Sequence, residues 1–168
     1  MKQLSKNPFK AMIQVADDIL AVCADRNAKF NMLRWCDGGH RGRCEVCLAG
    51  SIMLKRLGAP RTLSTLPSFY DDGSSVVYGQ LCAFNALRWG ILDFLECWPA
   101  NRDICRAWRD NSELQQVLCE LPSLKLTEIY PTKRRMRAYA ENMRFVAKKM
   151  LRKTQQLIRK GELCEFVK

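Results

Sequence analysis

A sustained helical period over residues 132–160 is the feature that most constrains the fold. Apolar and small side chains recur in steps of four and three residues, which places them on one side of an α-helix: Met136, Ala140, Met143, Ala147, Met150, Thr154 and Leu157. Pro131 precedes Thr132, a residue type that caps helices, so the sequence predicts one long helix from about Thr132 to Lys160. A seam of this length requires the rest of the chain to cover it.

The remainder of the chain also predicts helices, with almost no alternation of strand type. The expected helices span about 8–25 with Asn7 as N-cap, 43–57, 80–98, 104–108, and 112–121 with Ser112 as N-cap. Residues 80–98 are apolar on nearly all sides, which is typical of a buried central helix. The prediction is an all-α fold, a single compact domain over residues 1–168 with five to six helices and one long irregular loop, Arg61 to Gly79.

Charge is distributed unevenly along this domain. Residues 125–168 hold 13 of the 28 Lys and Arg but 4 of the 17 Asp and Glu, so they carry +9 of the formal +11 and leave +2 for residues 1–124. The near-neutral part therefore supplies most of the core, and the basic C-terminal helix region is expected to meet an acidic partner.

Cations follow a second side of the expected long helix, over 22 residues or about 33 Å. A solvated helix face usually mixes charges of both signs, whereas Glu141 is the one acid along this row. A solvated face remains the alternative to a binding face. The predicted binding residues are Arg137, Arg144, Lys148, Lys149, Arg152, Lys153 and Arg159.

Nucleic-acid phosphates are the favoured partner, because guanidinium groups make bidentate bonds to phosphate oxygens. No sequence-reading motif accompanies the row, so we expect binding without sequence preference. The alternative is an inhibitor of a bacterial host or defence factor, which would dock on an acidic protein surface through the same residues or the Arg61 to Gly79 loop. A membrane role is disfavoured, because the seam opposite the cations lacks the Trp and Phe of an interfacial helix.

A cysteine-rich turn precedes the expected helix 43–57. Cys36, His40, Cys44 and Cys47 form a C-x3-H-x3-C-x2-C array that holds the chain's single histidine. Thiolates and imidazole are ligands of tetrahedral zinc, and four of them would make the site structural. A redox C-x2-C pair and simple packing around a helix start are the alternatives. The cofactor prediction is accordingly none, or one structural zinc.

No catalytic constellation is found in the sequence. A phosphate-binding loop and a dinucleotide-binding motif are both missing, and a single histidine excludes metal triads that depend on several histidines. We therefore expect a protein that acts by binding, with a small enzyme as a third possibility. Without an apolar leader of the secretory type, the expected location is the cytoplasm.

Three segments carry a resemblance to a group of known proteins. They are Phe30-Asn31-Met32-x2-Trp35, Cys44-x2-Cys47-x-Ala49-Gly50 and Leu81-x-Ala83-x-Asn85-Ala86-Leu87-Arg88-x-Gly90. In this order they resemble small proteins of unassigned function from bacteriophages and bacterial mobile elements, which share an F-x-M-x-x-W segment, a C-x2-C-x-A-G helix and an A-L-x-x-L-R-x-G helix. The resemblance implies a phage accessory role in host takeover or anti-defence, in the cytoplasm of a bacterial host, and it implies no particular activity.

Overall fold

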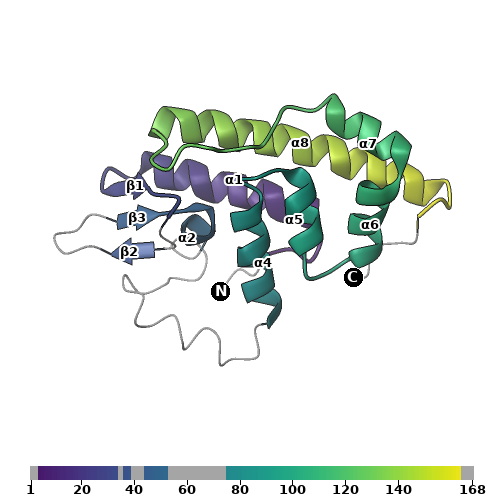
Figure 1. Ribbon diagram of the computed structural model, residues 1–168, viewed down its shortest axis with the longest axis horizontal. Coiled ribbons are helices and arrows are strands. Elements are labelled where there is room, and N and C mark those ends of the chain that lie inside the picture. Colours follow the sequence, from purple (N-terminus) through teal and green to yellow (C-terminus); the bar gives the residue numbers. More distant parts are fainter. Residues whose placement is uncertain (1–3, 34–35, 39–43, 53–74, 164–168) are drawn as a thin grey trace.

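The computed structural model describes residues 4–33, 36–38, 44–52 and 75–163, and these are mostly helical (Figure 1). Seven helices and three short strands follow one another along the described chain: α1 (Pro8–Ala24), β1 (Ala28–Phe30), β2 (Cys36–Gly38), β3 (Cys44–Val46), α2 (Leu48–Ile52), α4 (Ser75–Ala86), α5 (Ile91–Cys97), α6 (Arg102–Asp110), α7 (Ser112–Cys119) and α8 (Lys133–Arg159). The predicted helical fold is confirmed. None of the helices in these ranges is long and apolar enough to cross a membrane.

Helices α1 and α8 lie side by side and antiparallel, and their contact is the most extensive between any two elements described (Figure 1). Two polar contacts follow this antiparallel direction. Lys133 Nζ, at the start of α8, donates to the carbonyl of Asp25, just after α1, and Arg144, further along α8, pairs with Asp17. All seven residues of the predicted α8 seam are buried, as are Phe9, Met12 and Ile19 of α1. The seam prediction is therefore confirmed, and α1 is the element that covers most of it.

The helix termini follow the expected capping chemistry with one correction. Asn7 caps α1 by accepting from the amides of Phe9 and Lys10, and the Thr132 hydroxyl accepts from the Arg135 amide at the start of α8. At α7 the predicted cap, Ser112, is wrong: Asn111 accepts from two amides of the first turn, and the helix begins at Ser112. Asn and Ser are both good N-cap residues, so the sequence alone does not decide which of these two adjacent positions caps α7.

Residues 44–46 form a strand, so the predicted helix over 43–57 is wrong at its start. β3 is the middle strand of a three-stranded sheet, parallel to β1 and antiparallel to β2. Each strand has three residues, too few for an alternating pattern to show in the sequence. Helix α2 starts at Leu48, and residues 53–57 lie outside the described ranges.

The expected helix over 80–98 is two helices, α4 and α5, which explains why the described residues hold more helices than predicted. The break falls at Gly90, whose φ of 158° is a conformation that L side chains rarely adopt. Helix α4 begins at Ser75, so the end of the predicted loop Arg61 to Gly79 is helical, and residues 61–74 lie outside the described ranges. The prediction of a single central helix is therefore wrong.

The aromatic side chains before and after the break have different surroundings. Phe94 is fully buried among rings, with centroids 5.0 Å from Phe84 and 5.2 Å from Trp98. Trp89 is 57% exposed, and the guanidinium carbon of Arg88 lies 4.7 Å from its ring centroid. The expectation that both Trp89 and Phe94 belong to the core is correct for Phe94 and wrong for Trp89.

An extended segment, residues 121–131, connects α7 to α8 and joins distant parts of the chain. The Leu126 amide donates to the carbonyl of Arg88, and the Met32 amide donates to the carbonyl of Ile129, both at 2.8 Å. Arg88 also donates to the Met32 carbonyl through Nη1. Leu124 and Leu126 are buried within this segment, so it forms a further wall of the core beside α8.

We predict opposite outcomes for alanine at Phe94 and at Trp89. Phe94→Ala removes a fully buried ring and should lower the free energy of unfolding by about 3 to 5 kcal/mol. Trp89→Ala removes an exposed ring with one cation contact and should cost less than about 1 kcal/mol. Urea unfolding of both variants measures the difference, and equal losses would contradict the division between α4 and α5.

Candidate functional site

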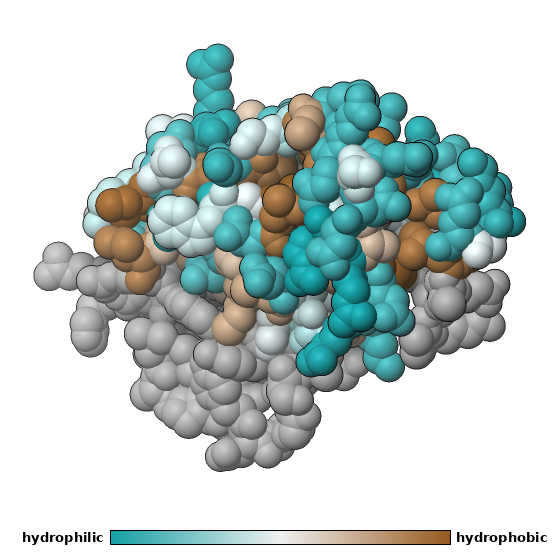
Figure 2. All heavy atoms as spheres, turned by 45° about the vertical axis from the view of Figure 1, so that its right-hand side comes forward, coloured by the Kyte–Doolittle hydropathy of each residue, from teal (hydrophilic) through white to brown (hydrophobic). Residues whose placement is uncertain are grey.

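The side of α8 that faces away from α1 and α6 is strongly basic. Helix α8 carries ten Lys and Arg and one acid, Glu141, and seven of the ten cations are exposed. We use the name cationic face for the exposed side whose basic members are Arg134, Arg137, Lys148, Lys149, Arg152 and Arg159. Hydrophilic side chains cover most of the upper part of the molecule in Figure 2, where the elements along the top of Figure 1 lie, with small hydrophobic patches between them.

The structure exposes five of the seven predicted binding residues, namely Arg137, Lys148, Lys149, Arg152 and Arg159. Arg144 and Lys153 are half-buried at the edges of the helix. Arg144 pairs with Asp17 of α1, so its charge is partly compensated within the protein. The prediction missed Arg134, which lies three residues before Arg137 and therefore on the same side of the helix.

Few acids in the described ranges compensate the charge of this face. Arg135, at the border of the face, pairs with Glu128 at 3.0 Å. Hydrogen bonds from the backbone lower the pKa of the Glu128 carboxyl below its ordinary value, and the contact with Arg135 lowers it further. The six basic members of the cationic face make no ion pair with another residue in the ranges described. Their charges are therefore open to solvent or to an anionic ligand.

The spacing of the cations carries an energetic cost. Arg144, Lys148 and Arg152 follow one another at intervals of four residues, which brings like charges together on the helix surface. Each such pair destabilises a helix by about 0.2 to 0.5 kcal/mol. The long buried seam offsets this repulsion, and an anion bound along the row would remove it.

An aromatic ring lies within the cationic face. Phe145 is 48% exposed, and the ammonium of Lys149 lies 5.7 Å from its ring centroid. Lys148 and Arg152, three and seven residues further along, are on the same side of α8. Sequence reasoning missed this ring, although its position outside the four-and-three seam was visible.

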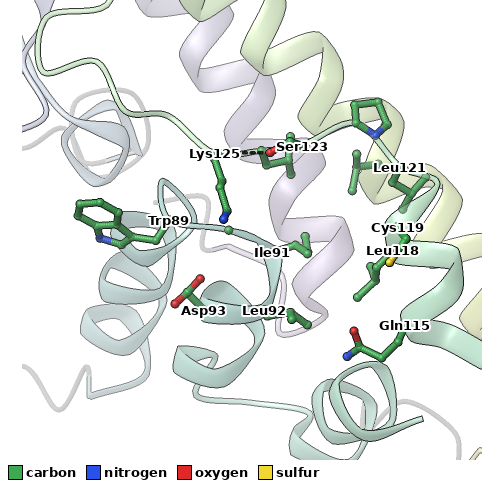
Figure 3. Close-up of a pocket in the computed structure, with 14 residues that line it drawn as sticks. Trp89, Ile91, Leu92, Asp93, Gln115, Leu118, Cys119, Leu121, Ser123 and Lys125 are labelled. Carbon is green, nitrogen blue, oxygen red and sulfur yellow. Dashed lines mark hydrogen bonds between the residues drawn. The ribbon is translucent and has the colours of Figure 1, made fainter. Parts of the chain in front are cut away.

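A hollow lies between α5, α7 and the segment after α7 (Figure 3). Its volume is about 530 Å³, and Ile91, Leu92 and Leu118 form much of its apolar wall. In Figure 3 the Lys125 side chain reaches toward the start of α5, while the Trp89 ring points away from the other lining residues. Cys119 is the one thiol among the lining residues, and no histidine is among them. The hollow therefore offers an apolar surface but no nucleophile paired with a general base.

The structure brings two of the predicted zinc ligands to neighbouring strands. Cys36 on β2 pairs with Val46, and Cys44 on β3 pairs with Gly38, so the two cysteines lie at diagonal ends of the register, two positions from direct pairing. Cys47 is buried before α2, where its sulfur accepts from the Gly50 amide at 3.4 Å, and burial raises the pKa of its thiol. This contact is the one expected of a helix-capping group. His40 lies outside the described residues, so the zinc site stays a prediction.

Within the described ranges no three side chains of the His, Cys, Asp and Glu types come together as a metal-binding group. Comparisons with known proteins give no further guide to the site: no family model matches the chain, and neither a curated protein nor a solved structure matches it. The cationic face is therefore the described feature from whose chemistry a function can be inferred.

If Cys36, His40, Cys44 and Cys47 hold a structural zinc, protein purified without chelator should contain about one zinc per chain, measured by elemental analysis. Cys44→Ser should release the metal and lower the melting temperature, because a structural zinc contributes its binding energy to folding. Native mass spectrometry without metal, together with an unchanged melt for His40→Ala, would assign these residues to packing instead.

Proposed function

We propose that the protein binds nucleic-acid phosphates, without reading the base sequence, through the cationic face of α8. The observation that supports this most directly is the row of exposed cations on α8, which make no ion pair within the described ranges. Neutralising phosphates releases counterions, which supplies affinity without base contacts.

The composition of the face suits phosphate groups, and its length suits a polymer of them. Four of its six cations are Arg, whose planar guanidinium matches phosphate oxygens with two parallel bonds. The row from Arg137 to Arg159 extends over about 33 Å, which suits a long, regularly charged polymer. An acidic protein surface remains the competing partner, and the accessory role in a phage or mobile element is supported by the sequence resemblance alone.

We predict that neutralising the face abolishes most binding. Arg137→Gln, Lys148→Gln and Arg152→Gln together should lower affinity for DNA at least tenfold at moderate salt and reduce the dependence of log K on log salt by about 2 to 3. Gln is a good helix former, so the helical content should stay the same. Fluorescence anisotropy over a salt series and circular dichroism measure the two quantities.

The matched control removes the same charge from other elements. Lys29, Arg102 and Arg106 are exposed on β1 and α6, and their replacement by Gln also lowers the net charge by three. This control should keep most of the affinity. Equal losses in both triple variants would show a general effect of net charge and contradict a defined face.

A substitution on α1 should act in the opposite direction. Asp17→Asn releases Arg144 and removes an acid from the edge of the cationic face, so we expect DNA affinity to rise about twofold to fivefold at low salt. The gain should fade as salt screens the charges. Asp103→Asn on α6 makes the same charge change elsewhere, and an equal gain there would argue against a role for this edge.

A further inference from the structure

Phe145 is an exposed aromatic ring on α8, whose other aromatic side chain, Tyr139, is buried in the core. Arg144 pairs with Asp17 of α1 and Val146 is buried, whereas Phe145, which lies between them in the chain, is 48% exposed. The ring is not among the buried side chains or the partly buried ones that pack against the core. The fold itself therefore gives this ring no packing role.

The surroundings of the ring are cationic. Lys149 stands over it at 5.7 Å, as expected from the tilt of helical side chains toward the N-terminus. Lys148 and Arg152 are its other neighbours on the C-terminal side, and Glu141 is the neighbour one turn before it. One aromatic surface is thus combined with several phosphate-binding groups.

Duplex and single-stranded nucleic acids differ in what they offer to such a combination. A duplex presents phosphates, but its base faces are hidden in the stack, so an isolated phenyl ring on a cationic helix gains little from it. A single strand presents phosphates and open base faces together, and stacking of a base on an aromatic ring tolerates any sequence.

We infer that the cationic face binds single-stranded nucleic acid in preference to duplex, with a base stacked on Phe145 and the flanking phosphates held by Lys148, Lys149 and Arg152. This rests on the proposed function, since it assigns the form of nucleic acid that the same face takes. Phe145 acts as the stacking platform, and the cations supply the sequence-independent part of the affinity.

The test measures affinities of the full chain for a 20-nucleotide oligo-dT and for a mixed-sequence 20-base-pair duplex. Phe145→Leu keeps an apolar side chain and a helix-forming residue but removes the ring face. We expect a loss of about tenfold for oligo-dT, a change within about twofold for the duplex, and an unaltered salt slope for both. Phe145→Trp should retain the oligo-dT affinity, and circular dichroism confirms that each variant is folded.

Trp89→Leu is the matched control, because Trp89 is also an exposed ring with a cation over it but belongs to the α4–α5 connection. It should leave both affinities unchanged. Equal affinities of the wild type for strand and duplex, or an equal effect of Phe145→Leu on both, would overturn the stacking inference while the proposed function stands. Binding of polyglutamate as tight as that of oligo-dT would overturn both in favour of an acidic protein partner.

Discussion

The antiparallel contact between α1 and α8 is the interaction on which the rest of the structure depends. It joins the two longest of the described helices, and the small residues Ala140 and Ala147 alternate there with methionines that adapt to irregular neighbours. Without this cover, a helix with ten cations and one acid would repel itself and expose its seam. The stability of α8 therefore comes from tertiary burial more than from its own sequence.

Further elements close the seam and thereby determine which side of α8 is left open. Trp108 of α6 donates to the Thr154 hydroxyl at 2.8 Å, which satisfies a polar group inside the seam, and its ring meets Phe9 of α1 edge-on. Segment 121–131 lies along the border that Arg135 and Glu128 mark. The cationic face is the part of α8 that these partners leave uncovered, so the same packing that stabilises the helix presents its charges.

The buried cysteine thiols of the described residues have little reactivity. Burial raises the pKa of the Cys105 thiol to about 12, and Cys23 is shifted upward for the same reason despite nearby Arg137 and Lys133. Such thiols are neutral near pH 7 and behave as small apolar residues. An interaction surface on α8 is consequently the feature of the described residues with the strongest physical argument for function.

The sequence by itself determined α1, α8, the buried seam and the row of cations, because long periodic segments specify both a helix and its faces. It did not determine the strand at 44–46, the break at Gly90 or the exposure of Trp89, because these depend on pairing and packing between residues far apart in the chain. The pairing of Arg144 with Asp17 and the exposure of Phe145 likewise follow from where α1 lies against α8. Local periodicity fixes which residues share a face, whereas only tertiary packing decides which face is covered.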